Sequence, residues 1–232
     1  MIPIRDDNPT GRAPFVTRTL IAVNVALFLY QLSLGPGLRM FMYEWGMVPL
    51  RLSAALQVGN EPVVVPAATL LTSTFLHGGW LHLIGNMWYL WIFGDNIEDR
   101  LGHARFLIFY LVAGVFAGFV HYLTAASSQV PTVGASGAIA AVLGGYLVAF
   151  PRARVLTLVP LFIFIQFVWL PAVLVLGLWF FYQFFSGALS LSYGAGGGVA
   201  WWAHIGGFVF GAIAMRALGR RPRRPVSEAW VE

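Results

Sequence analysis

A serine and a histidine that lie in apolar segments of the chain could together perform acyl transfer. They are Ser136 and His204. A serine hydroxyl becomes a nucleophile when a nearby base accepts its proton, and histidine suits that role near neutral pH. A carboxylate normally orients such a histidine, but no Asp or Glu occurs between Arg100 and Glu228. The sequence therefore allows a serine–histidine dyad and disfavours a Ser-His-Asp triad.

Two further polar residues, His82 and Asn86, could stabilise the negative charge that develops on oxygen during such a reaction. They are four residues apart, so in a helix they lie on one face. Together with the backbone N–H of Ser136 they are candidate oxyanion donors. Removing one such donor typically costs about 3 kcal/mol of transition-state stabilisation.

The composition places these residues in a membrane protein. Of the 232 residues, 59% are hydrophobic and only 10% are charged, whereas soluble domains carry about 25% charged residues. The chain has no cysteine, which excludes disulfides and a thiol nucleophile. Its net charge of +5 comes from arginines at the ends of apolar runs. No basic stripe is present, so we expect no nucleic-acid partner.

Long uncharged stretches predict six membrane-spanning helices, since a helix needs roughly 20 apolar residues to cross a bilayer. Stretches 19–38 and 62–94 hold one helix each, near 16–33 and 81–97, and stretches 106–151 and 155–215 hold two each. Turn-forming residues at 127–134 and 186–198 separate the paired helices. We therefore expect an all-α membrane protein, a bundle of six transmembrane helices.

The arginines indicate the orientation of this bundle. Twelve of the 14 fall on the side of the termini, and only Arg39 and Arg51 fall on the other. Cytoplasmic segments are enriched in basic residues, so both termini are predicted to be cytoplasmic. The predicted organisation is a cytoplasmic segment 1–15, a six-helix domain 16–219 with a large, non-helical extracytoplasmic loop at about 34–79, and a basic cytoplasmic tail 220–232.

This topology brings the four polar residues to one depth. The second, fourth and sixth helices run from outside to inside, and His82, Asn86, Ser136 and His204 each lie in the first turns of one of them. We therefore expect all four near the outer face of the membrane.

Small residues follow the serine and the histidine at helical spacing. Ala140 and Gly144 follow Ser136, and Gly207 and Gly211 follow His204. Such stripes let two helices pack closely in a membrane. Packing along them would bring the Ser136 hydroxyl towards the imidazole.

Other interpretations remain open for each residue. Ser136 could be a helix-packing residue, Asn86 an interhelical hydrogen-bonding residue, and His82 with His204 part of a metal site. No third histidine or carboxylate is expected at the same depth, so we expect neither a metal nor a cofactor. A small transporter would need paired broken helices and charges in mid-bilayer, and neither is evident.

Four blocks of the chain resemble the rhomboid family of intramembrane serine proteases, in its six-span prokaryotic form. They are residues 77–86 (HGGWLHLIGN), 94–102 (GDNIEDRLG), 134–137 (GASG) and 203–207 (AHIGG). The resemblance covers nearly the whole chain.

The resemblance implies a serine endopeptidase with Ser136 as nucleophile, His204 as general base and acid, and His82, Asn86 and the Ser136 amide as oxyanion donors. It would cleave transmembrane proteins at or near the outer end of their membrane helices, without a cofactor. The location implied is a bacterial cytoplasmic membrane, with the site facing outward. A catalytically silent rhomboid-like protein that binds such helices is the alternative. Positions expected to be structural are Gly94, Glu98, Gly102, Gly134, Gly137, Gly207 and Gly211.

Three details go beyond this pattern. Glu98 is interpreted as a helix-end carboxylate paired with a nearby arginine. Some members place an aromatic residue four after the serine, against the histidine, but this chain has Ala140, and Trp201 or Trp202 is a candidate substitute. The first loop lacks the Trp-Arg pair that well-known members carry there. The aromatic segment 162–185 is a candidate lateral gate for the substrate.

Overall fold

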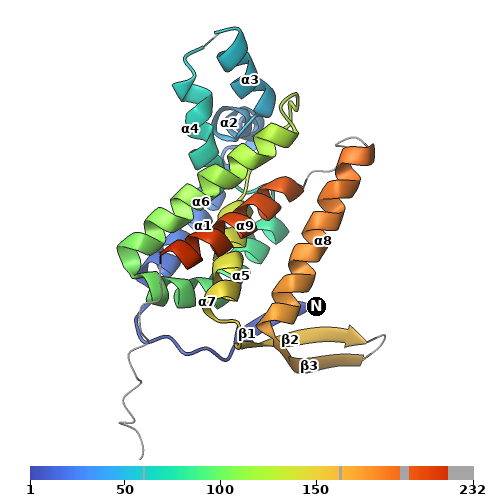
Figure 1. The fold of residues 1–232 in the computed structure, drawn as a ribbon. Helices are drawn as coiled ribbons and strands as arrows, with labels where there is room; N and C mark the ends of the chain where they lie inside the picture. Colours follow the sequence, from blue (N-terminus) through green and yellow to red (C-terminus); the bar gives the residue numbers. More distant parts are fainter. Residues whose placement is uncertain (60, 162–163, 194–198, 219–232) are drawn as a thin grey trace, which may run out of the picture.

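The computed structural model describes residues 1–59, 61–161, 164–193 and 199–218 (Figure 1). The long helices are α1 (Phe15–Ser33), α5 (Trp80–Leu101), α6 (His103–Thr124), α7 (Ser136–Ala149), α8 (Ala172–Tyr193) and α9 (Trp201–Ala217). Among the described residues, α1, α6 and the Ala172–Ser190 part of α8 are long and apolar enough to cross a membrane. α7 and α9 have 14 and 17 residues, fewer than the roughly 20 that a span needs, so a count of six spans stays a prediction.

The prediction of an all-α protein is wrong in one region. An antiparallel sheet of three strands forms in the order β1 (Ile2–Asp6), β2 (Arg154–Leu161) and β3 (Phe164–Pro171). β2 and β3 pair from Arg154 opposite Pro171 to Leu161 opposite Phe164. Both strands are apolar and rich in β-branched and aromatic residues, which favour strands, and an uncharged run alone does not distinguish a strand from a buried helix. The fifth long helix therefore begins only at Ala172.

The segment 34–79 was predicted to be a non-helical loop, and this is also wrong. It folds into three short α-helices and two single 3₁₀ turns, which lie at the end of the bundle away from the sheet (Figure 1). An ion pair joins two parts of this region: the Arg51 guanidinium binds the Glu61 carboxylate at 2.7 Å. The helices are α2 (Leu38–Trp45), α3 (Pro49–Gln57) and α4 (Val64–Thr72), and the 3₁₀ turns are Gly35–Gly37 and Ser73–Phe75.

α7 lies at the centre of the bundle, with ten of its 14 residues buried. Its close neighbour is α9. A Cβ atom added to Gly144, Gly207 or Gly211 would overlap a backbone carbonyl of the facing helix, and one added to Gly137 would lie 2.6 Å from Ala117 on α6. The predicted close packing along the two stripes of small residues is present, and it fixes where the first turns of α7 and α9 lie relative to each other.

Glu98 joins three helices and pairs with no arginine among the described residues, so that part of the prediction is wrong there. Its carboxylate accepts hydrogen bonds from the backbone N–H groups of Val16 (2.8 Å) and Thr17 (2.7 Å) and from the Thr17 hydroxyl (2.7 Å). The His103 Nδ1 lies 2.5 Å from Oε1 of the same carboxylate. The first N–H groups of a helix lack partners within the helix and favour a negative charge. Glu98 therefore caps α1 from α5.

Two glycines of the same block allow this arrangement. A Cβ on Gly94 would lie 3.2 Å from the Thr17 hydroxyl oxygen, so this glycine lets α1 approach α5. Gly102 ends α5 with φ of +81°, a backbone conformation that favours glycine, and α6 begins at the next residue.

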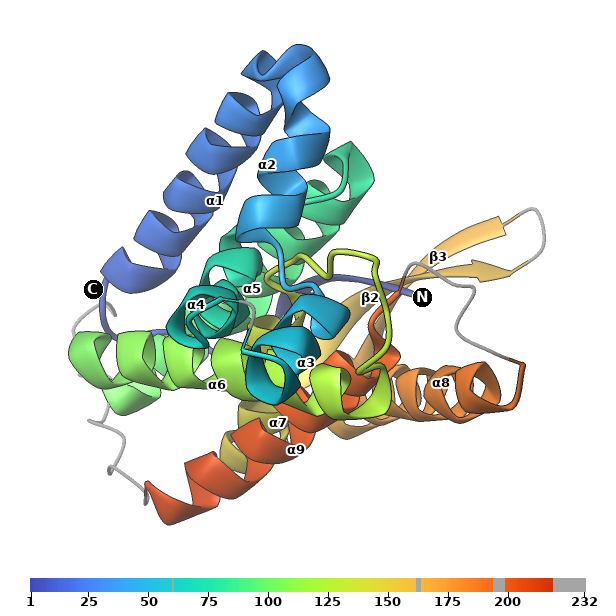
Figure 2. The same ribbon diagram turned by 90° about the horizontal axis from the view of Figure 1, so that it is seen from above.

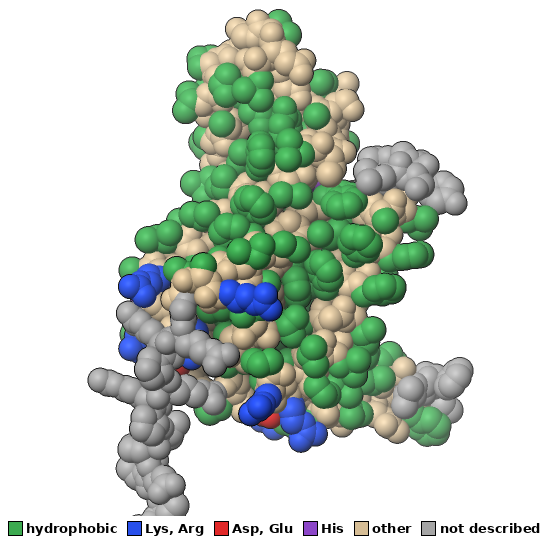
Figure 3. All heavy atoms as spheres, viewed as in Figure 1, with side chains coloured by type: hydrophobic (Ala, Val, Ile, Leu, Met, Phe, Trp, Pro, Cys, Tyr) green, Lys and Arg blue, Asp and Glu red, His purple; other side chains and the backbone are tan. Residues whose placement is uncertain are grey.

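The surface is typical of a protein that faces lipid. Large apolar side chains are exposed along α6 and α8, among them Ile108 (62%) and Phe181 (64%), and hydrophobic side chains are spread over the face in Figure 3. The arginines visible on that face gather in its lower half, away from α2 to α4 (Figures 1 and 3). In both views α8 lies at the edge of the bundle (Figures 1 and 2).

Candidate active site

The first turns of α7 and α9 bring the serine and the histidine together. Ser136 is the first residue of α7, and His204 lies in the first turn of α9. The Ser136 Oγ and the His204 Nε2 are 2.7 Å apart. This is the hydrogen-bond distance that a nucleophile and its base require.

A residue that the sequence analysis missed orients the imidazole. The His204 Nδ1 lies 2.7 Å from the side-chain oxygen Oε1 of Gln183 on α8, and Gln183 is buried. A carbonyl oxygen can only accept, so Nδ1 carries the ring proton and Nε2 is left to accept the Ser136 hydroxyl proton. Gln183 therefore takes the place where a triad has a carboxylate. The available signal was that this is the one amide in the sequence of α8, where a polar residue needs a reason.

Aromatic rings from two helices contact the same imidazole. Trp179 on α8 has its ring centroid 6.0 Å from that of His204, at 36° between the planes. Trp201 meets the imidazole edge-on at 6.4 Å. Trp201 was one of the two substitutes expected because of Ala140, whereas Trp179 was missed. Trp179 and Gln183 are four residues apart and so share the face of α8 that supports His204.

The two candidate oxyanion donors line one cavity with the serine and the histidine. This cavity has a volume of about 1150 Å³, and His82, Asn86, Ser136, Gln183 and His204 are among its lining residues. The Asn86 Nδ2 is buried and has no hydrogen-bond partner in the described part of the chain. A buried donor without a partner costs about 1–3 kcal/mol, a cost that a bound oxyanion would relieve.

Gly134 makes room for His82 beside the serine. A Cβ on Gly134 would lie 2.7 Å from Cε1 and Nε2 of His82 and 3.6 Å from the Ser136 Oγ, and its φ is +132°. The His82 Nδ1 accepts the Gly78 backbone N–H at 3.4 Å, which leaves Nε2 to carry the ring proton. The proton-bearing edge of His82 thus lies on the side of the cavity where the Ser136 hydroxyl lies.

His77 and Gln31, to which the sequence analysis gave no role, support His82 from behind. The His77 ring packs edge-on against the His82 ring with centroids 5.2 Å apart. Gln31 on α1 accepts from the His77 backbone N–H (3.1 Å) and donates to its carbonyl (3.0 Å). Among the described residues, no group of three or more His, Cys, Asp or Glu side chains could hold a metal ion, so the open interpretation of a His82–His204 metal site has no third ligand there.

Comparisons with known proteins agree with the motif blocks. The Rhomboid domain matches residues 67–221. The human presenilin-associated rhomboid-like protein, mitochondrial, is 32% identical over 182 residues, which cover 75% of this chain and 44% of that protein. Presenilin-associated rhomboid-like protein A, mitochondrial, of Danio rerio is 33% identical over 172 residues, which cover 70% of this chain and 41% of that protein. Rhomboid-like protein 11, chloroplastic, of Arabidopsis thaliana is 41% identical over 69 residues (30% and 24%).

These matches extend over most of the chain but less than half of the animal relatives' length. The part matched by the Rhomboid domain includes every residue described above around Ser136 and His204, with the exception of Gln31. Domain and relatives together show that this membrane protein belongs to the rhomboid family.

Proposed function

We propose that the chain is an intramembrane serine endopeptidase that cleaves transmembrane proteins. The observation that carries the proposal is the Gln183–His204–Ser136 chain of hydrogen bonds, with 2.7 Å at each step. The imidazole is held in the tautomer that can accept the serine proton. A histidine that only filled space between helices would not need both ring nitrogens paired in this order.

In this proposal the Ser136 Oγ attacks the carbonyl carbon of the scissile peptide bond while His204 Nε2 takes the hydroxyl proton. The carbonyl electrons move onto oxygen, which receives hydrogen bonds from Asn86, His82 and the Ser136 backbone N–H. When the C–N bond breaks, His204 gives its proton to the leaving amine, and an ester remains on Ser136. Water then attacks the ester with His204 again as base, which releases the carboxylic acid and restores the hydroxyl.

The substrate class follows from the position of the site in the predicted topology. With six spans in residues 16–219 and both termini in the cytoplasm, the first turns of α5, α7 and α9 face the outer side. We therefore propose cleavage at or near the outer end of a substrate helix. Such a helix hides its carbonyls in internal hydrogen bonds, so substrates with Gly or Pro near the cleaved bond should unwind and react faster.

α8 is the proposed gate through which a substrate enters. It stands at the edge of the bundle, and its aromatic residues Phe181, Tyr182 and Phe185 are exposed. Its opposite face carries Gln183 and Trp179 against His204. An outward movement of α8 would therefore loosen the base as well as admit the substrate. Residues 162–163 of the predicted gate segment lie outside the described residues, and 164–171 form β3.

The identity of the membrane that contains this protein is a separate question. The presenilin-associated relatives are mitochondrial by name, so the comparisons do not support a bacterial cytoplasmic membrane. That location stays a prediction from the sequence.

The proposal is tested by covalent labelling. A serine-reactive fluorophosphonate or isocoumarin should modify the purified protein once, and peptide mapping should place the adduct on Ser136. His204→Ala should lose the label because the hydroxyl then lacks its base. The exposed Ser33 on α1 is the internal control and should stay unmodified. An adduct on another residue, or equal labelling of His204→Ala, would contradict the assignment, and a silent rhomboid-like protein would give no adduct.

Gln183→Leu should lower kcat at least about tenfold while KM changes little, because the variant removes the group that fixes the imidazole tautomer. Gln183→Glu should restore most of kcat, since a carboxylate accepts a hydrogen bond from the same Nδ1–H group. Gln166→Leu is the matched control, because Gln166 lies exposed on β3. Steady-state cleavage of a single-span reporter checks this. Full kcat in Gln183→Leu, or no recovery in Gln183→Glu, would refute the positioning role.

A further inference from the structure

A second large cavity lies at the opposite end of α7 from Ser136. Its volume is about 1060 Å³, and the residues at the end of α7 and just after it, 147–153, form much of its wall. α7 has 14 residues, so at 1.5 Å per residue the cavity lies about 20 Å from the serine. It is separate from the candidate active site.

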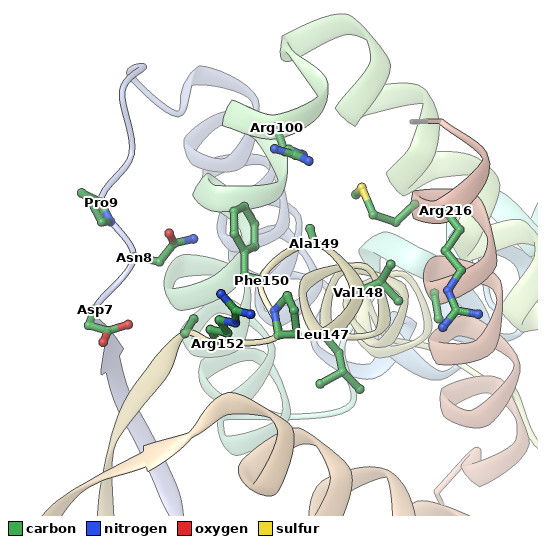
Figure 4. A pocket seen from close by; sticks show the side chains of 14 residues that line it. Asp7, Asn8, Pro9, Arg100, Leu147, Val148, Ala149, Phe150, Arg152 and Arg216 are labelled. Carbon is green, nitrogen blue, oxygen red and sulfur yellow. The ribbon is translucent and has the colours of Figure 1, made fainter. Parts of the chain in front are cut away.

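Three arginines from different segments line this cavity. Arg100 comes from the end of α5, Arg152 from the turn after α7, and Arg216 from the end of α9 (Figure 4). Asp7 is the one carboxylate of the lining, and it accepts the backbone N–H of Arg154 at 2.8 Å. The charged lining therefore has a formal balance of +2.

The guanidinium groups are not neutralised by the protein in the part that the structure describes. None of the three arginines forms an ion pair with a described carboxylate. The Arg100 Nε is buried and has no hydrogen-bond partner there. Its neighbour Asp99 faces Arg12 instead, at 3.8 Å. A buried guanidinium N–H without an acceptor is costly, so the cavity is suited to an anion.

Apart from Asn8, the rest of the lining is apolar. Leu147, Val148, Phe150, Ala212 and Met215 form walls beside the arginines. A small hydrophilic anion gains nothing from such walls, whereas an amphiphile with an anionic head and an acyl chain uses both parts of the cavity. Arginine binds phosphate oxygens through paired N–H donors.

The position of the cavity favours a lipid. In the predicted topology this end faces the cytoplasm, and four more arginines follow Arg216 in the sequence at 220–224. Basic pockets between membrane helices on the cytoplasmic or matrix side bind anionic lipid headgroups. We propose that this cavity binds the phosphate group of an anionic phospholipid, with its acyl chains along the apolar wall.

The test measures lipid binding to the full chain. The protein is placed in phosphatidylcholine nanodiscs that contain increasing fractions of phosphatidylglycerol, and retained phosphatidylglycerol is counted by native mass spectrometry. Arg152→Gln/Arg216→Gln should weaken its retention at least about tenfold, a loss of about 1.4 kcal/mol. Both side chains are exposed, so this variant should fold.

The matched control removes the same charge elsewhere. Arg18→Gln/Arg105→Gln changes two exposed arginines of α1 and α6 that do not line the cavity, and retention should stay within about threefold of wild type, the change expected of surface charges far from a site. Equal losses in the two double variants would overturn the proposal, because they would mean a general attraction of the basic surface.

A soluble competitor distinguishes a lipid from a free phosphate compound. Glycerol phosphate has the same anionic group without acyl chains. It should displace phosphatidylglycerol only at concentrations at least about 10³-fold higher, because about 4 kcal/mol of apolar burial is absent. Displacement at comparable concentration would overturn the lipid assignment. Labelling of Ser136 should be the same in both double variants, so failure here is distinguishable from failure of the proposed protease activity.

Discussion

Ser136→Ala should reduce cleavage of a single-span reporter to the uncatalysed background, a loss of roughly 10⁴- to 10⁶-fold in kcat. The variant removes the atom that we propose attacks the peptide bond, and no other described hydroxyl is paired with His204 in the structure. Because the residues of a catalytic unit act together, His204→Ala should cause a loss of similar size, and the double variant should be little worse than either. Reporter fragments are quantified by gel or mass spectrometry.

The control for this prediction is Ser33→Ala. Ser33 is exposed at the end of α1, where its hydroxyl bonds to its own helix at the Tyr30 carbonyl, so cleavage should be unchanged. Equal cleavage by wild type and Ser136→Ala would end the assignment of Ser136. A wild type that captures the reporter without cutting it would favour the silent, helix-binding alternative.

The helices of the bundle were predictable because charges mark their ends. The arginines and acids that bound each apolar run placed the first, second and third long helices close to α1, α5 and α6. The stretch 155–215 contains no charged residue, so no charge indicated where its helices begin and end. There the sequence offers β-branched and aromatic residues next to Pro160 and Pro171. The strand 154–161 pairs with β3, which follows it, and with β1, which lies far away in the chain.

The site was partly predictable for a related reason. Ser136 and His204 stand out as polar residues in apolar segments, and small residues at helical spacing after each predict the contact between their helices. Gln183 and Trp179 reach His204 only because α8 packs beside α9, and nothing local in the sequence sets that contact. A search of the apolar segments for a polar residue that could pair with Nδ1 of His204 would have singled out Gln183.

The small residues between α7 and α9 should matter for stability as much as Ser136 does for chemistry. Gly211→Ala should lower the free energy of unfolding by about 3 kcal/mol, at the upper end of overpacking effects. The added methyl group would overlap the Ala141 carbonyl across the helix contact. Backbone atoms cannot give way as a flexible side chain can, so the two helices must separate.

Gly177→Ala is the matched control, because it makes the same chemical change in α8 where nothing lies within 4 Å of the new methyl group. It should be neutral or stabilising by up to about 1 kcal/mol, since alanine favours a helix over glycine. Reversible unfolding in a detergent titration compares the two. Since α7 and α9 also carry Ser136 and His204, the folded fraction of Gly211→Ala should cleave more slowly than wild type. If both variants unfold alike, the glycine contact does not set the distance between the serine and its base.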